Sequence, residues 1–142
     1  MDINQLKQRI QPCYWMGEGG HRSVYDLGNG FILKVAVDYN APLVESIQAN
    51  RKEWELYQTA PDKGYLCPIE WMSSDGKLLV MPNAEQLPKP ATSLSVDQFI
   101  HHMVKLGYDE VDAVSPANWV GWYLVDYGWV TKNPKPTFHL PH

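Results

Sequence analysis

A lysine within an otherwise apolar segment most constrains how this chain can fold. Residues 31–36 read Phe-Ile-Leu-Lys-Val-Ala, so Lys34 is the one charged residue of a segment that favours a buried β-strand. A buried lysine is costly unless an anion meets its amine. At the edge of a sheet, its apolar stem can instead lie on the protein while the amine reaches water. Lys34 is therefore either an edge lysine or the cation of an anion site.

A glycine-rich stretch and a tight turn precede this strand. Gly17 and Gly19 stand one residue apart and lead into residues 23–27, where Val24 is one of the residues that favour another strand. Residues 28–30 read Gly-Asn-Gly, which supplies the positive φ angles of a hairpin turn. The stretch predicts two antiparallel strands that follow a glycine loop.

This order of motifs resembles the first two signatures of the protein-kinase-like superfamily. In that family a glycine-rich loop lies over the phosphates of ATP, and a strand lysine pairs with the α- and β-phosphates. The resemblance implies that Gly17, Gly19 and Val24 lie against the nucleotide. It also implies that Lys34 binds the phosphates. The third glycine of the family's loop is Arg22 here, which departs from the pattern.

A long helix is predicted after the lysine strand. Apolar residues recur at helical spacing from near Pro42 to about Gln58, which gives the helix a face to bury. In kinase-like folds this helix carries a glutamate that orients the lysine. Glu53 is the candidate because it falls late in the helix, near the face that we expect to be buried. Glu45 and Glu55 are rivals, and a solvated surface charge is the alternative for Glu53.

Two further strands complete the expected sheet. Residues 65–72 and 77–81 favour strands and are separated by a hairpin turn. Residues 13–16, a strand that leads into the glycine loop, bring the expected strands to five. Five antiparallel strands with one long helix after the third resemble a kinase N-terminal lobe. In that family residues 80–86 would link the lobes, and the resemblance places Met81 at the adenine. Pro82 removes one backbone donor from this linker.

The second half carries a capped helix and a candidate metal site. Ser95 and Gln98 form a capping box that opens a helix. Asn118 and Asp126 resemble the catalytic-loop asparagine and the metal-binding aspartate of kinases, with Tyr127 in place of the phenylalanine that follows that aspartate. The resemblance implies that Asn118 and Asp126 hold Mg²⁺, which prefers oxygen ligands.

Two departures bear on activity. The catalytic base of kinases lies five positions before the asparagine, and that position is Ala113, with Asp112 displaced by one residue. Either Asp112 acts as the base or the base is missing. Only 14 residues follow Gly128 (142 − 128), too few for an activation segment and substrate-docking helices. The resemblance thus implies a reduced C-lobe, similar to minimal kinase-like proteins of phages and bacterial mobile elements.

Composition narrows the expected partners and location. The net charge of −4 and the absence of a long basic run argue against a nucleic-acid surface. No apolar run approaches the length of a membrane span. Cys13 and Cys67 match no metal-ligand spacing, and we expect free thiols in a cytoplasmic protein, with one disulfide as the alternative. The oligomeric state is not indicated.

The expected fold class is α+β, in one minimal kinase-like domain over residues 1–142. Residues 1–83 would form an N-lobe with a five-stranded antiparallel sheet, one long helix and a short helix over residues 2–10. Residues 84–130 would form a much reduced, mainly helical C-lobe, and residues 131–142 an extended tail. The leading hypothesis is ATP and Mg²⁺ binding with phosphoryl transfer to a hydroxyl acceptor. The alternatives are a pseudokinase that binds a protein partner, and an unrelated α+β binding module.

Overall fold

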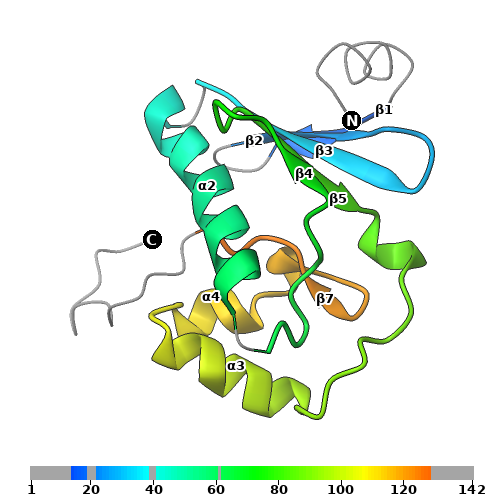
Figure 1. Cartoon of the computed structure of the whole chain (residues 1–142), viewed down its shortest axis with the longest axis vertical. Coiled ribbons are helices and arrows are strands. Elements are labelled where there is room, and N and C mark those ends of the chain that lie inside the picture. The colour runs from blue at the N-terminus through cyan, green and yellow to red at the C-terminus, as the bar shows by residue number, and fades with distance from the viewer. Residues whose placement is uncertain (1–13, 19–21, 39–40, 61, 129–142) are drawn as a thin grey trace.

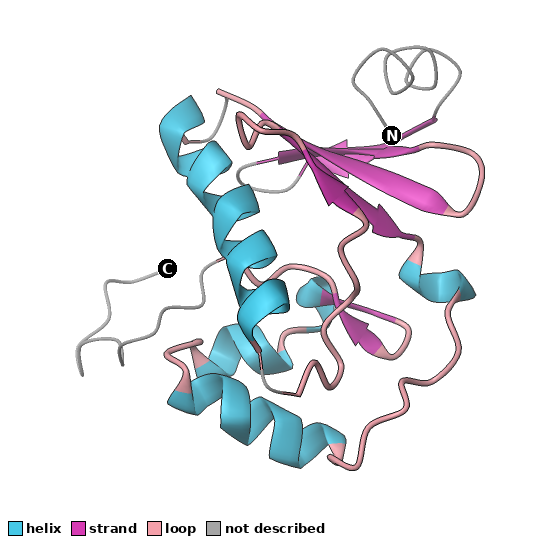
Figure 2. Ribbon diagram, in the orientation of Figure 1, coloured by secondary structure: helices cyan, strands magenta, loops and turns pink. Residues whose placement is uncertain are grey.

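The computed structural model describes residues 14–18, 22–38, 41–60 and 62–128. The helix expected over residues 2–10, Cys13, Gly19 and the tail over residues 131–142 lie outside these ranges. Figures 1 and 2 show an antiparallel sheet above a smaller C-terminal part (residues 84–128), with a long helix running along one side of both. The mixed α+β class with an antiparallel sheet is confirmed.

The sheet places the lysine strand in its interior. Its order is β1-β2-β3-β5-β4, and all neighbouring strands are antiparallel. The strands are β1 (Tyr14–Glu18), β2 (Arg22–Asp26), β3 (Phe31–Ala36), β4 (Trp71–Met72) and β5 (Leu78–Pro82). Gly28 and Gly30 turn the β2–β3 hairpin with φ angles of 82° and 89°. Because β3 is the middle strand, Lys34 is not an edge lysine.

The strand expected over residues 65–72 is wrong for most of its length, since only Trp71–Met72 joins the sheet. The preceding segment pairs instead with the C-terminal part. The Cys67 amide donates to the Leu124 carbonyl at 2.9 Å, and the Leu124 amide donates to the Tyr65 carbonyl at 2.8 Å. Pro68 follows and has no amide hydrogen to continue a ladder. The segment therefore connects the sheet to the part below it.

The long helix α2 (Leu43–Thr59) follows β3, close to the predicted bounds. Trp54 and Tyr57 pack against the core partly buried, but the fully buried positions of the helix are mostly polar. The apolar spacing predicts a hydrophobic contact surface, whereas the buried residues of α2 are Ser46, Ala49, Asn50 and Glu53. Three of these four are polar, and the hydroxyl of Ser46 donates to the Val37 carbonyl at 2.8 Å. A helix buries such residues only where partners satisfy them. The partners of Asn50 and Glu53 lie on β2 and β3, in the β4–β5 turn and just after β7.

The C-terminal part is not purely helical. Its elements are the 3₁₀ turn η1 (Ala84–Gln86), α3 (Val96–Lys105), α4 (Glu110–Val114), the 3₁₀ turn η2 (Pro116–Asn118), and the strands β6 (Trp119–Val120) and β7 (Tyr123–Leu124). The capping box of Ser95 and Gln98 is confirmed. The short helix α4 and the β6–β7 hairpin were not predicted; α3, α4 and the two 3₁₀ turns still make up most of the regular structure of this part.

One apolar core joins the sheet to the C-terminal part. It includes Ile32, Leu79 and Met81 from the sheet, together with Phe99, Met103, Leu124 and Tyr127 from below. This shared core brings the end of β7 close to the face of the sheet from which the Lys34 side chain projects and against which α2 packs. Among the described residues, none of the helices has the length and apolar character that crossing a bilayer requires.

Candidate functional site

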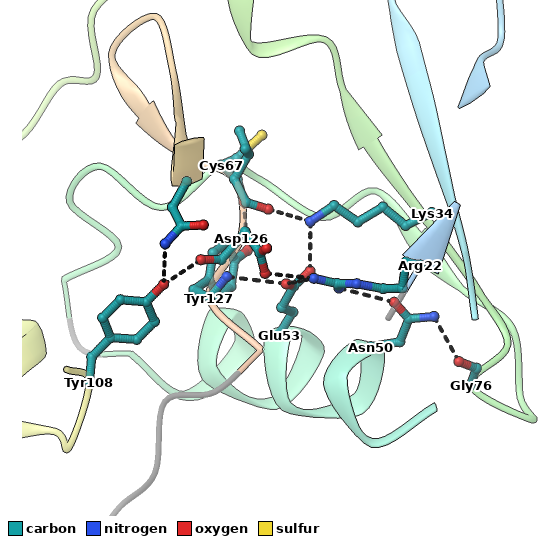
Figure 3. A network of polar contacts seen from close by, with 11 residues as sticks. Arg22, Lys34, Asn50, Glu53, Cys67, Gly76, Tyr108, Asp126 and Tyr127 are labelled. Atoms are coloured by element: carbon teal, nitrogen blue, oxygen red, sulfur yellow. Dashed lines mark hydrogen bonds and ion pairs between the residues drawn. The ribbon is translucent and has the colours of Figure 1, made fainter. Parts of the chain in front are cut away.

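The centre of the site is an ion pair between the sheet and α2. Lys34 Nζ lies 3.0 Å from Glu53 Oε1, and the two side chains are 6% and 0% exposed (Figure 3). The same ammonium group donates to the carbonyl of Val125, just after β7. Of the three candidate glutamates, Glu53 is thus the one that meets Lys34, while Glu45 and Glu55 are exposed on α2.

Glu53 accepts two further hydrogen bonds. The guanidinium of Arg22 donates to its Oε2 at 2.7 Å, and the backbone amide of Tyr127 donates to the same oxygen at 3.1 Å. A fully buried carboxylate is tolerated when it is paired and hydrogen-bonded in this way. Glu53 therefore fixes three segments at once: β2, β3 and the backbone that follows β7.

The residues predicted to hold a metal lie on neighbouring segments. The Val125 amide donates to the Asn118 carbonyl at 2.8 Å, which brings the end of η2 beside Asp126. The hydroxyl of Tyr108 donates to the Asp126 carbonyl at 2.6 Å. The amide nitrogen of Asn118 donates to the Asp112 carbonyl at 2.8 Å, so the Asn118 side chain braces the end of α4.

The Asp126 carboxylate already has a cationic partner. Arg22 lies 2.7 Å from its Oδ1, and the Asp126 side chain is 43% exposed. Among the residues that the structure describes, no three His, Cys, Asp or Glu side chains are grouped to hold a metal ion. A divalent ion at Asp126 would stand close to a guanidinium that does not deprotonate. As arranged, these donors do not fit Mg²⁺.

The candidate base lies on α4. Asp112 is partly exposed there, and the neighbouring Ala113 is buried. The pKa of Tyr108 is raised first by burial and then by the charges of Asp126 and Asp112. Asp112 is thus within electrostatic reach of the hydroxyl that binds the Asp126 backbone.

The described residues that we expect to contact the nucleotide lie on strands of the sheet. Gly17 pairs with Val24 next to an irregularity in the β1–β2 register, and Val24 pairs with Lys34 on β3. Met81 is buried within β5 and packs in the core, opposite Ile32. Gly19 lies outside the described residues. β2, which carries Val24, therefore lies between the strand of Gly17 and the lysine strand β3.

Burial sets the electrostatics of the two cations. Burial lowers the pKa of Lys34, the charge of Arg22 lowers it further, and the carboxylates of Glu53 and Asp126 oppose this shift only in part. Burial also lowers the pKa of Arg22, but Glu53 and Asp126 outweigh that effect and leave it above its ordinary value. Arg22 therefore keeps its charge at every pH at which the protein is folded.

Sequence reasoning missed three members of this network: Arg22, Asn50 and Tyr108. Arg22 was noted only as a missing glycine, although a charged residue opening a strand needs a partner. The Asn50 side chain accepts from Arg22 at 3.2 Å and donates to the Gly76 carbonyl at 2.9 Å. Asn50 stands three residues before Glu53, so the two share one face of α2, and this i,i+3 relation was the available signal.

No protein-family model and no curated protein sequence matches this chain. Among solved structures, the streptomycin–ATP–APH(2")-IIa ternary complex matches with a TM-score of 0.38 and 15% sequence identity, over 82% of this chain and 40% of that one. The structural likeness to that protein is distant. The chain spans less than half the length of this structure.

Proposed function

We propose that this chain is a reduced kinase-like domain that binds ATP between the sheet and its C-terminal part. The observation that supports this most is the Lys34–Glu53 ion pair, held against the segment Val125–Gly128. The pair joins the centre of the sheet, the long helix and the end of the β6–β7 hairpin. A lysine held in this way is a preorganised cation, of the kind that neutralises phosphate charge without reorganisation.

Under this proposal the chain's own residues divide the work. Lys34 binds the α- and β-phosphates and Glu53 orients it, while Gly17 and Val24 lie against the nucleotide. Phosphoryl transfer depends mainly on positioning and charge neutralisation, so a partly exposed carboxylate such as Asp112 suffices as the base toward a hydroxyl acceptor. No step is derived from magnesium at Asn118 and Asp126, because Arg22 and the Asp112 carbonyl already engage these side chains.

A second candidate function is protein binding by a pseudokinase. It is favoured by Ala113, which stands buried at the expected base position. It is also favoured by apolar side chains exposed on the C-terminal part, since Val111 and Trp122 are 71% and 47% exposed.

The test of nucleotide binding is the thermal midpoint of the purified chain with and without ATP, each with Mg²⁺ or EDTA. ATP at about one hundred times its Kd stabilises the fold by about 2.7 kcal/mol, or about 9 °C for a chain of this size. We expect Lys34→Ala to lose this rise and the exposed-lysine control Lys77→Ala to keep it. No rise at millimolar ATP in any condition would refute the proposal.

A turnover assay separates the two candidates. If ATP raises the midpoint and ADP accumulates with a hydroxyl acceptor, Asp112→Asn should slow that accumulation without changing the ATP-dependent rise. If ATP binds and no acceptor yields ADP, the pseudokinase is favoured. In that event Trp122→Ala should weaken capture of a protein partner while ATP binding stays unchanged.

A further inference from the structure

Arg22 is the member of the site that no motif assigns. It opens β2, where the glycine loop of the resembling family has its third glycine, and its side chain runs inward beneath the sheet (Figure 3). That side chain is 6% exposed. It reaches Glu53 Oε2 and Asp126 Oδ1, each at 2.7 Å. A single guanidinium therefore bridges the helix carboxylate and the aspartate predicted to bind metal.

A second residue of α2, Asn50, also binds the guanidinium. Asn50 Oδ1 accepts from Arg22 at 3.2 Å, while the amide nitrogen of Asn50 is fixed by the Gly76 carbonyl at 2.9 Å. Two of the three groups that bind Arg22 thus lie on one rigid helix. Asp126 is the remaining one, and it is the more exposed carboxylate of the pair.

Counting charges shows what Arg22 contributes. Lys34 and Arg22 carry two positive charges, and Glu53 and Asp126 carry two negative charges, so the cluster is neutral. Without Arg22 the same cluster would carry one net negative charge, concentrated at Asp126. A divalent cation is attracted to such a carboxylate and is repelled by a neighbouring guanidinium.

We propose that Arg22 occupies the cationic position at Asp126 that a divalent metal ion would otherwise take, so that the site excludes metal and binds nucleotide without it. The second half of this inference rests on the nucleotide binding proposed above. The first half concerns only the chain and the metal. Arg22 thereby determines the metal dependence of the site.

The test uses Mn²⁺ alone as the probe, with free Mn²⁺ measured by electron paramagnetic resonance. We expect no saturable binding by the parent chain. Arg22→Gln should bind one ion per chain, at least tenfold more tightly than the parent chain does. The gain should vanish in Arg22→Gln combined with Asp126→Asn. The exposed arginine Arg51 provides the matched control, and Arg51→Gln should behave like the parent. Arg22→Lys, which keeps the charge, should also exclude the ion.

Two results would overturn the inference. The first is saturable Mn²⁺ binding by the parent chain that Asp126→Asn abolishes. The second is a folded Arg22→Gln with no gain in Mn²⁺ affinity. Should circular dichroism show that Arg22→Gln is unfolded, the parent and Arg22→Lys decide, because saturable binding by either refutes the exclusion.

A measurement of ATP binding with and without EDTA distinguishes this inference from the proposed function. We expect EDTA to leave ATP binding by the parent chain unchanged within twofold. If EDTA abolishes ATP binding, the metal-free site is refuted while the nucleotide site stands. If ATP fails to bind in every condition, the proposed function is refuted, and the Mn²⁺ experiment still decides the position of Arg22.

Discussion

Replacing Glu53 by glutamine tests whether the buried ion cluster holds the molecule together. The substitution keeps the size of the side chain and removes one negative charge. Lys34 and Arg22 then share the single carboxylate of Asp126, and the cluster changes from neutral to one net positive charge. The glutamine amide nitrogen is a donor and cannot accept from either cation or from the backbone amide of Tyr127.

The magnitude follows from the burial of the group. Breaking a buried ion pair by removing one partner costs about 3–5 kcal/mol, because the other charge is left uncompensated. The total stability of a domain is about 5–15 kcal/mol. We therefore expect Glu53→Gln to lower the thermal midpoint by about 10–20 °C, since each kcal/mol corresponds to about 3–5 °C at this length.

The control is Glu55→Gln on the same helix. Glu55 is exposed, and surface substitutions usually change stability by less than about 0.5 kcal/mol. Urea denaturation of both variants gives the free energy of unfolding. Equal losses in Glu53→Gln and Glu55→Gln would refute the role of the cluster.

A double variant isolates the charge effect. Glu53→Gln combined with Arg22→Gln leaves Lys34 and Asp126 as a neutral pair. We expect this double variant to be more stable than the sum of the single losses predicts, by about 1–3 kcal/mol. Strict additivity would show that the two residues act independently.

Three further predictions follow from the surroundings of the cluster. Burial raises the pKa of Cys67 from 9.0 to about 12, so the thiol loses its proton more readily in the unfolded chain and stability falls as pH rises above about 9. In urea titrations Cys67→Ala should remove about 0.8 kcal/mol of the stability loss between about pH 8 and about pH 9.5, and an unchanged dependence of stability on pH would contradict this. A Cβ at Gly128 would lie 2.7 Å from the Ala49 carbonyl oxygen, so Gly128→Ala should lower the free energy of unfolding by about 1–3 kcal/mol. An unaltered urea midpoint would show that α2 shifts to accommodate the methyl group. Tyr108→Phe removes the donor to the Asp126 carbonyl and should cost about 1–2 kcal/mol by the same assay, whereas no loss would mean that water replaces the hydroxyl.

Much of the site was predictable because its signals are local. The charge pattern of residues 31–36 and the Gly-Asn-Gly turn predict β3 and its hairpin, and helical spacing places α2 after them. Lys34 and Glu53 were paired by resemblance, and the structure brings them to 3.0 Å. Asn118 and Asp126 were singled out in the same way, and they lie on adjoining segments.

The features that the sequence did not predict depend on contacts between segments that are distant in the chain. The composition of residues 65–72 favours a strand, but pairing with Leu124 draws the first half of that segment away from the sheet. The spacing of apolar residues on α2 predicts a hydrophobic face. That face packs against the core only partly buried, and the fully buried Asn50 and Glu53 beside it are polar because they bind the cations of Arg22 and Lys34. The polar burial on α2 is visible only once the β2–β3 register places Arg22 beside Ala36 of β3.

The most direct measurement of where the phosphates bind is labelling with an ATP acyl-phosphate probe, which acylates the lysine beside the bound phosphates. Peptide mass spectrometry then identifies the modified residue. We expect Lys34 to be acylated, and excess ATP to suppress that label while leaving the exposed control Lys77 unchanged. Labelling confined to exposed lysines and insensitive to ATP would contradict a phosphate site at Lys34.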